Sequence, residues 1–218
     1  MVVRIIQGSL RGKRWVVGSS THGCWLGSYE YAKQRLFEQS VRSGDIVYDI
    51  GAHTGFYTLL ASVLVGSTGR VVAFEPLPRN LAYLRKHLAL NHVRNTVVME
   101  GAVCENEGEV RIVAGLNSSE TRVDAKGTMS VRALTIDHLI FRDGFPAPTV
   151  IKIDVEGAEH AVLRGGIQLL TEKRPLIFLS THGPQLHTEY CRLLTGLGYT
   201  LQPEIGDNIE LCSEVVGR

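Results

Sequence analysis

The sequence predicts an α/β protein with a mostly parallel sheet, and three observations support this prediction. Short apolar runs rich in valine and isoleucine recur along the chain, as expected for strands that are buried on both faces. Amphipathic segments of helical length separate these runs, and this alternation is typical of a parallel sheet covered by helices. A length of 218 residues with 44% hydrophobic residues suffices for one such domain with a modest extension.

The alternating part of the chain is expected to contain five strands and four helices. The strands are expected at residues 46–50, 71–75, 96–100, 150–154 and 176–180, and the helices at 55–65, 78–91, 158–171 and 186–197. A closing hairpin is expected from Tyr199 onward, with a turn at Gly206–Asn208 and a strand at Ile209–Cys212. The sheet is therefore predicted to have seven strands.

Two segments depart from this alternation. Apolar residues on both sides of Gly8–Gly12 predict a β-hairpin, and a helix is expected over 29–39. We therefore expect residues 1–40 to form an extension to a domain spanning 41–218. The segment 104–149 is polar and contains several glycines, and we expect it to hold strands near 109–113 and 128–133 and a short helix near 135–140.

Composition argues against several classes of protein. The net charge of +1, without a basic stripe, argues against a nucleic-acid substrate. The four cysteines are widely spaced, which disfavours a disulfide framework or a zinc site and fits a cytoplasmic protein. The N-terminus does not read as a signal peptide, and the longest apolar run, near 59–65, is too short to cross a membrane.

The loop after the strand at 46–50 predicts a site for a cofactor that contains a nucleoside. This loop runs from Asp49 through Gly51, Ala52 and His53 to Gly55. A dinucleotide-binding loop normally has a second glycine where this chain has His53. Asp49 would repel a pyrophosphate but attract the ammonium of a bound amino acid. The loop therefore favours S-adenosylmethionine over NAD, with a turn-capping role for Asp49 as the alternative.

A second acid, Glu75, ends the next strand. Its distance from the glycine loop along the chain suits a carboxylate that accepts hydrogen bonds from both ribose hydroxyls. The alternative is that the Glu75-Pro76 dipeptide only ends a strand before a helix. In this architecture the adenine ring is expected to lie near Leu77 and Ala102.

These residues resemble the FkbM-type family of class I S-adenosylmethionine-dependent methyltransferases. The resemblance covers residues from about 25 to 200 and is carried by Gly27-Ser-Tyr-Glu30, Asp49–Thr58, Gly69–Pro76, Leu134-Thr-Ile-Asp137, Ile151-Lys-Ile-Asp-Val-Glu-Gly-Ala-Glu159 and Val162-Leu-Arg-Gly165. It implies a Rossmann-like sheet whose last strand is antiparallel, and O-methylation of hydroxyls on small molecules or sugars. It also implies that Asp49, Gly51, Glu75 and Asp154 line the cofactor and reaction site.

The chain departs from the family pattern at two places. Many members have Asn where this chain has His53, and many end the fifth strand with Glu, whereas this chain reads Leu179-Ser-Thr-His-Gly183. The second departure lies on the expected substrate side. The identity of the acceptor is therefore not carried over from the family.

Methyl transfer to a hydroxyl requires a base or a metal ion to deal with its proton. Asp154 ends the fourth strand, at the sheet edge where ligands bind in parallel α/β folds, and Glu156 follows two residues later. His182 follows the fifth strand and suits general base catalysis. The alternatives are that Asp154 caps the helix beginning near Gly157, that Glu156 lies in its first turn, and that His182 is structural.

Three further expectations concern ligands and partners. Asp154 and Glu156 are candidate ligands for a divalent cation such as Mg²⁺, although the sequence identifies no third oxygen ligand. Tyr29 and Glu30 are expected to fold over the cofactor, with the alternative that Glu30 starts a helix and Tyr29 packs beneath it. The edge of the N-terminal hairpin is a candidate surface for a homodimer.

The sequence thus predicts a methyltransferase for a small-molecule or saccharide acceptor, with two rival functions. One rival is an oxidoreductase that binds NAD, and the other is a scaffold that binds the cofactor without catalysis.

Overall fold

The computed structural model describes residues 1–113, 122–123, 127–182, 184–203 and 214–218. Its main sheet has seven strands in the order β12-β13-β11-β10-β3-β4-β5. The parallel strands are β3 (Ile46–Ile50), β4 (Arg70–Glu75), β5 (Thr96–Glu100), β10 (Val150–Ile153) and β11 (Leu176–Ser180). The last strand, β13 (Glu214–Gly217), is antiparallel to β11 and to β12 (Leu201–Pro203). The predicted seven-stranded sheet with an antiparallel last strand is confirmed.

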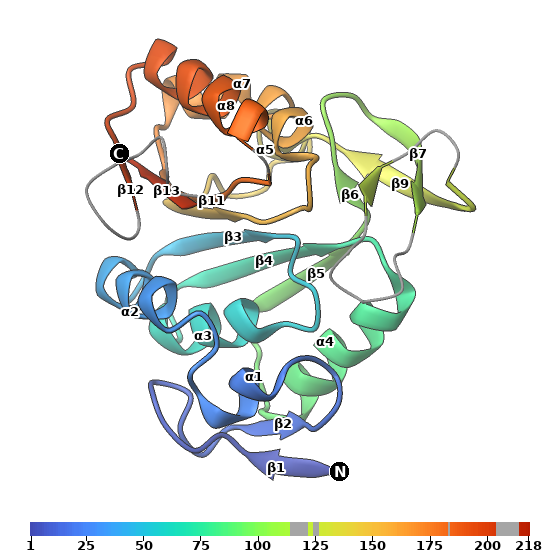
Figure 1. Ribbon diagram of the computed structural model, residues 1–218, viewed down its shortest axis with the longest axis vertical. Helices are drawn as coiled ribbons and strands as arrows, with labels where there is room; N and C mark the ends of the chain where they lie inside the picture. Colours follow the sequence, from blue (N-terminus) through green and yellow to red (C-terminus); the bar gives the residue numbers. More distant parts are fainter. Residues whose placement is uncertain (114–121, 124–126, 183, 204–213) are drawn as a thin grey trace.

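Helices cover both faces of this sheet (Figure 1). One face carries α2 (Tyr31–Ser40), α3 (Phe56–Leu64) and α4 (Pro78–Leu90), and the other carries α5 (Ile136–Phe141), α6 (Glu159–Arg164), α7 (Ile167–Glu172) and α8 (Pro184–Gly196). Neighbouring residues of one strand point into different cores, because strand side chains alternate between faces. Val47 belongs to the same core cluster as Phe37 of α2, whereas Tyr48 belongs to a second cluster with Leu163 of α6. The strands are therefore apolar on both sides.

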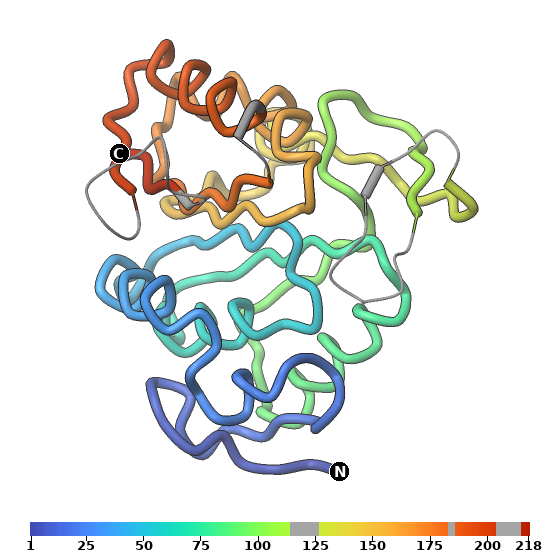
Figure 2. Tube along the Cα trace, viewed as in Figure 1, coloured from blue at the N-terminus to red at the C-terminus, as the bar shows by residue number. Residues whose placement is uncertain are grey.

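The N-terminal segment is anchored to this sheet domain. The predicted hairpin is confirmed, since β1 (Val2–Arg4) and β2 (Arg14–Val16) pair antiparallel, and a short helix that was not predicted, α1 (His22–Leu26), precedes α2. Trp15 of β2 is fully buried and stacks on His87 of α4, with ring centroids 3.7 Å apart. Figure 2 shows this segment lying beside α4. The division at residue 40 and pairing of two chains through the hairpin stay predictions.

A second, smaller sheet interrupts the alternation after β5. Its strand order is β6-β9-β7-β8, formed by β6 (Ala102–Val103), β9 (Met129–Leu134), β7 (Gly108–Val113) and β8 (Arg122–Val123). The strands predicted near 109–113 and 128–133 and the helix predicted near 135–140 correspond to β7, β9 and α5 and are confirmed.

The predicted helix at 158–171 is wrong as a single element, because it is divided into α6 and α7. The division falls at Gly165 and Gly166. A Cβ atom on Gly165 would lie 2.0 Å from the carbonyl oxygen of Cys104, so this glycine lets two backbones approach closely. The predicted turn at Gly206–Asn208 and strand at Ile209–Cys212 lie outside the described residues. None of the described helices is long and apolar enough to span a membrane.

Candidate functional site

The glycine loop follows β3 and lies between the ends of the strands on either side of it, β10 and β4. Gly51 has a φ of 77°, and a Cβ atom there would lie 1.9 Å from the carbonyl oxygen of Asp154, which follows β10. The backbone N–H groups of Gly51 and Ala52 both donate to the carbonyl oxygen of Phe74 in β4, at 3.1 and 2.9 Å. Only glycine fits this bend, because any side chain would meet the backbone of the neighbouring strand.

His53 and Gly55 complete this loop in left-handed conformations, with φ values of 51° and 93°. Burial, followed by the positive charge of Lys152, lowers the pKa of His53 to about 4. The imidazole of His53 is therefore neutral at neutral pH, and it faces the site without adding charge.

Glu75 is held in place at the end of β4 by three donors. One carboxylate oxygen accepts from the backbone N–H of His53 at 2.8 Å, and the other accepts from Leu77 N at 3.0 Å and Asn80 Nδ2 at 3.1 Å. Burial raises the pKa of Glu75, and these hydrogen bonds only partly oppose the increase. Glu75 therefore has a fixed orientation beside the loop. Its role in binding ribose stays a prediction.

The residues expected around adenine follow two neighbouring strands. Pro76 and Leu77 follow β4, whereas Ala102 begins β6 just after β5. Glu75 and Glu100 are register partners at the ends of β4 and β5, so the segments that follow leave the sheet side by side. A ring that lies across these strand ends would reach both, and this placement of adenine stays a prediction.

Asp49 lies beneath the loop, only 1% exposed, and has two described partners. Its Oδ1 is 3.2 Å from Nζ of Lys152, and its Oδ2 accepts from the hydroxyl of Thr58 at 2.6 Å. Lys152 and Asp49 are register partners on β10 and β3, so both side chains point to the same face. Asp49 thus balances a buried lysine, and its predicted contact with the cofactor stays a prediction.

Two buried lysines that sequence reasoning missed meet at Asp154. Nζ of Lys33, on α2, donates to Ser180 Oγ at 2.6 Å and lies 3.4 Å from Glu30 Oε2. The Nζ atoms of Lys33 and Lys152 both lie 3.7 Å from Asp154 Oδ2. Burial alone would lower the pKa of Lys152, but the carboxylates of Asp49 and Asp154 raise it. For Lys152 the available signal was a lysine within an apolar strand, because lysines are rarely buried without a partner.

These lysines keep Asp154 ionised. Burial alone would raise the pKa of Asp154, but Lys152, Lys33 and His182 lower it. The residue at the N-terminal cap of α6 is Ala158, so the interpretation of Asp154 as the cap of this helix is wrong. Glu156 precedes α6 with a φ of 53°, so the interpretation that places Glu156 in the first turn is also wrong.

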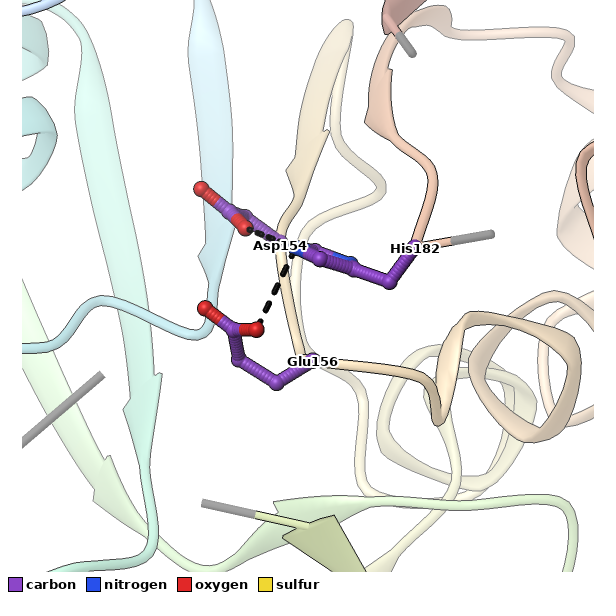
Figure 3. A group of neighbouring side chains, drawn as sticks. All are labelled: Asp154, Glu156 and His182. Carbon is purple, nitrogen blue, oxygen red and sulfur yellow. Dashed lines mark ion pairs between the residues drawn. The ribbon is translucent and has the colours of Figure 1, made fainter. Parts of the chain in front are cut away.

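His182 lies between three carboxylates, and Figure 3 shows two of them, those of Asp154 and Glu156. Its Nε2 is 3.3 Å from Glu156 Oε2 and 3.8 Å from Asp154 Oδ1, while its Nδ1 is 2.7 Å from Glu159 Oε1. Hydrogen bonding to Glu159 raises the pKa of His182 against the opposing effect of burial. The structure therefore brings together the three residues predicted for catalysis.

Glu159, which sequence reasoning also missed, fixes the orientation of His182. It is fully buried, and its carboxylate accepts from Tyr190 Oη and from Gly157 N, each at 3.1 Å. Burial alone would raise the pKa of Glu159, but the hydrogen bonds from His182 and Gly157 lower it. An acid in the first helical turn gave little signal, since helix dipoles favour acids there regardless of function.

A small cavity lies beside the glycine loop, between the loop and the N-terminal segment. Its lining includes Tyr29, His53, Tyr57, Lys152 and Asp154. The ring of Tyr29 meets Phe56 edge-on, with centroids 5.3 Å apart. Tyr29 thus packs against the start of α3, just after the loop, and its contact with a cofactor stays a prediction.

Glu30 occupies the N-terminal cap position of α2, with a φ of 45°, so the alternative that Glu30 starts a helix agrees with the structure. The ion pair between Glu30 and Lys33 also joins it to the other charged groups of the site. These groups form one chain of ion pairs, which we call the site network. Its five carboxylates are those of Glu30, Asp49, Asp154, Glu156 and Glu159, its two ammonium groups are those of Lys33 and Lys152, and its imidazole is that of His182.

The strand order, the antiparallel closing strand and the glycine loop after the first central strand together define a class I methyltransferase fold. Residues 49–201 match the family described as the methyltransferase FkbM domain. The chain belongs to this family of S-adenosylmethionine-dependent methyltransferases.

Individual relatives agree with this assignment. Hexuronic acid methyltransferase AglP of Haloferax volcanii is 25% identical over 134 residues, which cover 60% of this chain and 54% of that protein. The chain thus spans about half the length of this curated relative. The FkbM methyltransferase structure from Methylobacillus flagellatus matches 91% of this chain and 56% of that one, with a TM-score of 0.61 and 17% identity.

A third similar structure extends the likeness beyond the FkbM family. The precorrin-6y C5,15-methyltransferase from Geobacter metallireducens matches 93% of this chain and 90% of that chain, with a TM-score of 0.54 and 17% identity. At this level of identity the likeness concerns the fold.

Proposed function

We propose that this protein transfers the methyl group of S-adenosylmethionine to a hydroxyl of a sugar. The observation that carries the proposal is the placement of His182, Glu156 and Asp154 together at the carboxyl end of the sheet, next to the glycine loop. In parallel α/β folds this edge is where ligands bind. A base placed there meets the requirement of a hydroxyl acceptor.

The charge of the site network supports a cationic cofactor. With His182 neutral, five carboxylates face two ammonium groups, which leaves a negative excess. Such a site attracts the sulfonium of S-adenosylmethionine and repels the pyrophosphate of NAD. We therefore favour a methyltransferase over the rival oxidoreductase. The residues proposed to hold the cofactor are Tyr29, Glu30, Asp49, Gly51, Ala52, His53, Gly55, Glu75, Pro76, Leu77, Ala102 and Asp154.

The proposed reaction is an in-line displacement. The acceptor oxygen bonds to the methyl carbon, the carbon–sulfur bond breaks with its electron pair staying on sulfur, and the hydroxyl proton passes to the enzyme. Asp154 is held ionised by two lysines and is a weak base, so its role is to face the positive sulfur. His182 and Glu156 are the proposed proton acceptors, since Glu159 makes the imidazole more basic.

The relative that acts on a hexuronic acid supports a sugar acceptor. A hexuronic acid offers both hydroxyls and a carboxylate. The carboxylates of Asp154 and Glu156 lie 3.8 and 3.3 Å from His182, the proposed base, and so lie next to the reacting position. They would repel an acceptor carboxylate placed there. We therefore propose that the product is a methyl ether of a sugar hydroxyl rather than a methyl ester.

Labelled methyl transfer tests this proposal. The protein is incubated with labelled S-adenosylmethionine and a panel of neutral sugars and hexuronic acids, and the products are treated with mild alkali, which cleaves esters and leaves ethers. We expect an alkali-stable label on at least one sugar, and loss of turnover in His182→Ala with unchanged affinity for S-adenosylhomocysteine. His138→Ala, on α5, serves as the control variant. An alkali-labile product would overturn the choice of hydroxyl.

Silence across the panel, with S-adenosylhomocysteine bound, would instead favour the scaffold function. Tight binding of NAD without binding of S-adenosylhomocysteine would favour the oxidoreductase.

A further inference from the structure

We propose that Asp154, Glu156 and His182 form a binding site for one divalent cation that accepts mixed oxygen and nitrogen ligands, such as Mn²⁺. The inference rests on the proposed function and deepens it, because the cation would hold the acceptor hydroxyl at the reacting position. With the cation bound to His182, Glu156 is the remaining proton acceptor of the two named above. Sequence reasoning named Asp154 and Glu156 as candidate ligands for Mg²⁺ and found no third ligand. The structure supplies that ligand in His182, which follows a different strand.

The spacing of the three side chains suits a single ion. One ligand atom from each residue can be chosen so that all three lie within 4.8 Å of one another. Atoms bound to one ion at about 2.0–2.3 Å lie roughly 3–4 Å apart. The distances from His182 Nε2 to Glu156 Oε2 and Asp154 Oδ1, 3.3 and 3.8 Å, fall in this range. Figure 3 shows the three side chains converging from the ends of two strands.

A fourth residue, Glu159, prepares His182 as a ligand. Its buried carboxylate is 2.7 Å from Nδ1, so in the neutral ring the hydrogen lies on Nδ1 and the lone pair of Nε2 faces Asp154 and Glu156. This lone pair and the nearest carboxylate oxygens of Asp154 and Glu156 therefore face a common point, to which a cation would be attracted. Metal-binding histidines usually donate their other N–H to a carboxylate in this way. Glu159 is not one of the three proposed ligands, so its position is a separate observation.

The space between His182 Nε2 and the carboxylates of Asp154 and Glu156 can hold either a proton or a metal ion. The negative excess of the site network favours the metal ion. The site network has five carboxylates and two ammonium groups. A proton on His182 adds one positive charge, whereas a divalent cation adds two and compensates more of the excess. An imidazole ligand shifts the preference from Mg²⁺, which favours oxygen, toward Mn²⁺ and similar ions.

The site is open enough to bind an acceptor at the cation. The side chains of His182 and Glu156 are 33% and 36% exposed, so one side of the ion would face solvent or substrate. A hydroxyl bound there has a lowered pKa. Its proton passes to the second oxygen of Glu156 and then to water, while the acceptor oxygen forms its bond to the methyl carbon and the pair of the broken carbon–sulfur bond stays on sulfur.

Titration with Mn²⁺ tests the site without reference to activity. Protein freed of metal with a chelator is titrated with Mn²⁺, and free Mn²⁺ is followed by electron paramagnetic resonance. We expect one tight site per chain. Glu156→Gln should weaken it by about tenfold or more, as should His182→Asn, with circular dichroism verifying the fold of each.

A second histidine between carboxylates provides the matched control. His138 lies 2.8 Å from Glu107 and 3.4 Å from Asp143, and all three side chains are exposed by 40% or more. Glu107→Gln should leave Mn²⁺ affinity within about twofold of the wild type, since exposed groups hold ions weakly. Equal losses in Glu107→Gln and Glu156→Gln would mean adventitious surface binding and would overturn the site.

Binding of S-adenosylhomocysteine, measured by calorimetry on the same samples, separates the two proposals. If it binds and Mn²⁺ does not, the cation site is wrong and the methyltransferase proposal stands. If Mn²⁺ binds and S-adenosylhomocysteine does not, the proposed function fails while the cation site remains. Full methyl transfer in excess chelator would also overturn the cation's role.

Discussion

Lys152 is the residue on which the charge balance of the buried site depends most directly. Its ammonium lies 3.2 Å from Asp49 and 3.7 Å from Asp154, and its side chain is only 3% exposed. Lys152→Met should lower the free energy of unfolding by about 3–5 kcal/mol, because it leaves buried carboxylates without their partner. Urea denaturation measures this change. The double variant Asp49→Asn with Lys152→Met should recover part of the loss, and a single variant within about 1 kcal/mol of wild type would contradict the prediction.

Glu75 tests the cofactor site at the same scale. Glu75→Gln keeps the shape of the side chain and removes the charge that is proposed to accept from ribose. We expect affinity for S-adenosylhomocysteine to fall by about 1–3 kcal/mol, measured by calorimetry. Glu100→Gln is the matched control, since Glu100 is the register partner of Glu75 on β5 but is exposed and paired with Arg85. Equal affinity in wild type and Glu75→Gln would remove Glu75 from the site.

The predicted site residues share one property, which is that the sequence itself marks them. Asp154 and Glu75 are acids that interrupt or end apolar runs, so strand periodicity alone drew attention to them. Lys33 and Glu159 gave no such signal, because the partners that place them in the site, Ser180 and His182, come from distant parts of the chain. Lys33 bonds to Ser180, 147 positions away, and only the folded packing of α2 against β11 brings the two together.

At the scale of single elements, two glycines at helix ends are expected to respond oppositely to the same substitution. Gly165→Ala should destabilise the protein by several kcal/mol, since its Cβ would lie 2.0 Å from the backbone oxygen of Cys104. Gly196 ends α8 with no atom within 4 Å of its ideal Cβ. Gly196→Ala should therefore stabilise the protein by about 0.5–1 kcal/mol. Thermal unfolding compares the two, and equal changes would contradict this account.

Element boundaries were predictable where local pattern decides them. The strands at 46–50, 96–100 and 176–180 agree with β3, β5 and β11, because valine and isoleucine runs flanked by turn residues mark both ends. The division between α6 and α7 was missed for a physical reason. Gly165 permits a contact with Cys104, a residue on a separate segment, and helix periodicity carries no information about that contact.

His87 makes the attachment of the N-terminal hairpin sensitive to pH. Its Nε2 accepts from Val16 N at 3.0 Å, and its Nδ1 donates to Thr54 O at 2.8 Å, so only the neutral ring satisfies both bonds. Burial lowers the pKa of His87 to about 4. The unfolded chain then binds a proton at a higher pH than the native state does. Stability is therefore complete above about pH 6.5 and is lost as the pH falls toward 4.

The variant His87→Phe measures this contribution. Phe keeps a ring against Trp15 but has no proton to bind. Between pH 6.5 and 4 the wild type should lose up to about 3 kcal/mol more unfolding free energy than His87→Phe, as followed by urea denaturation. Parallel curves for the two proteins would show that His87 does not control the pH response of the hairpin.

At the scale of the whole molecule, the site joins parts of the chain that otherwise belong to different layers. The N-terminal segment supplies Lys33, and the central strands supply Asp49 and Lys152. His182 follows β11, and Glu159 is the first residue of α6. A ligand that contacts the glycine loop and Asp154 is therefore linked to all of these parts through the ion pairs of the site network. Binding is expected to stabilise the entire fold rather than a single loop.

Thermal unfolding with cofactor tests this expectation. A ligand that binds only the native state stabilises it by about 2.7 kcal/mol at 100 times its Kd. For a chain of this length that corresponds to an increase of roughly 5–10 °C in Tm. S-adenosylhomocysteine should produce this increase, and NAD at the same concentration should not, because the excess of carboxylates in the site network repels its phosphates. Glu75→Gln should reduce the shift with S-adenosylhomocysteine, whereas Glu100→Gln should preserve it. An equal or larger shift with NAD would contradict the charge argument on which the choice of cofactor depends.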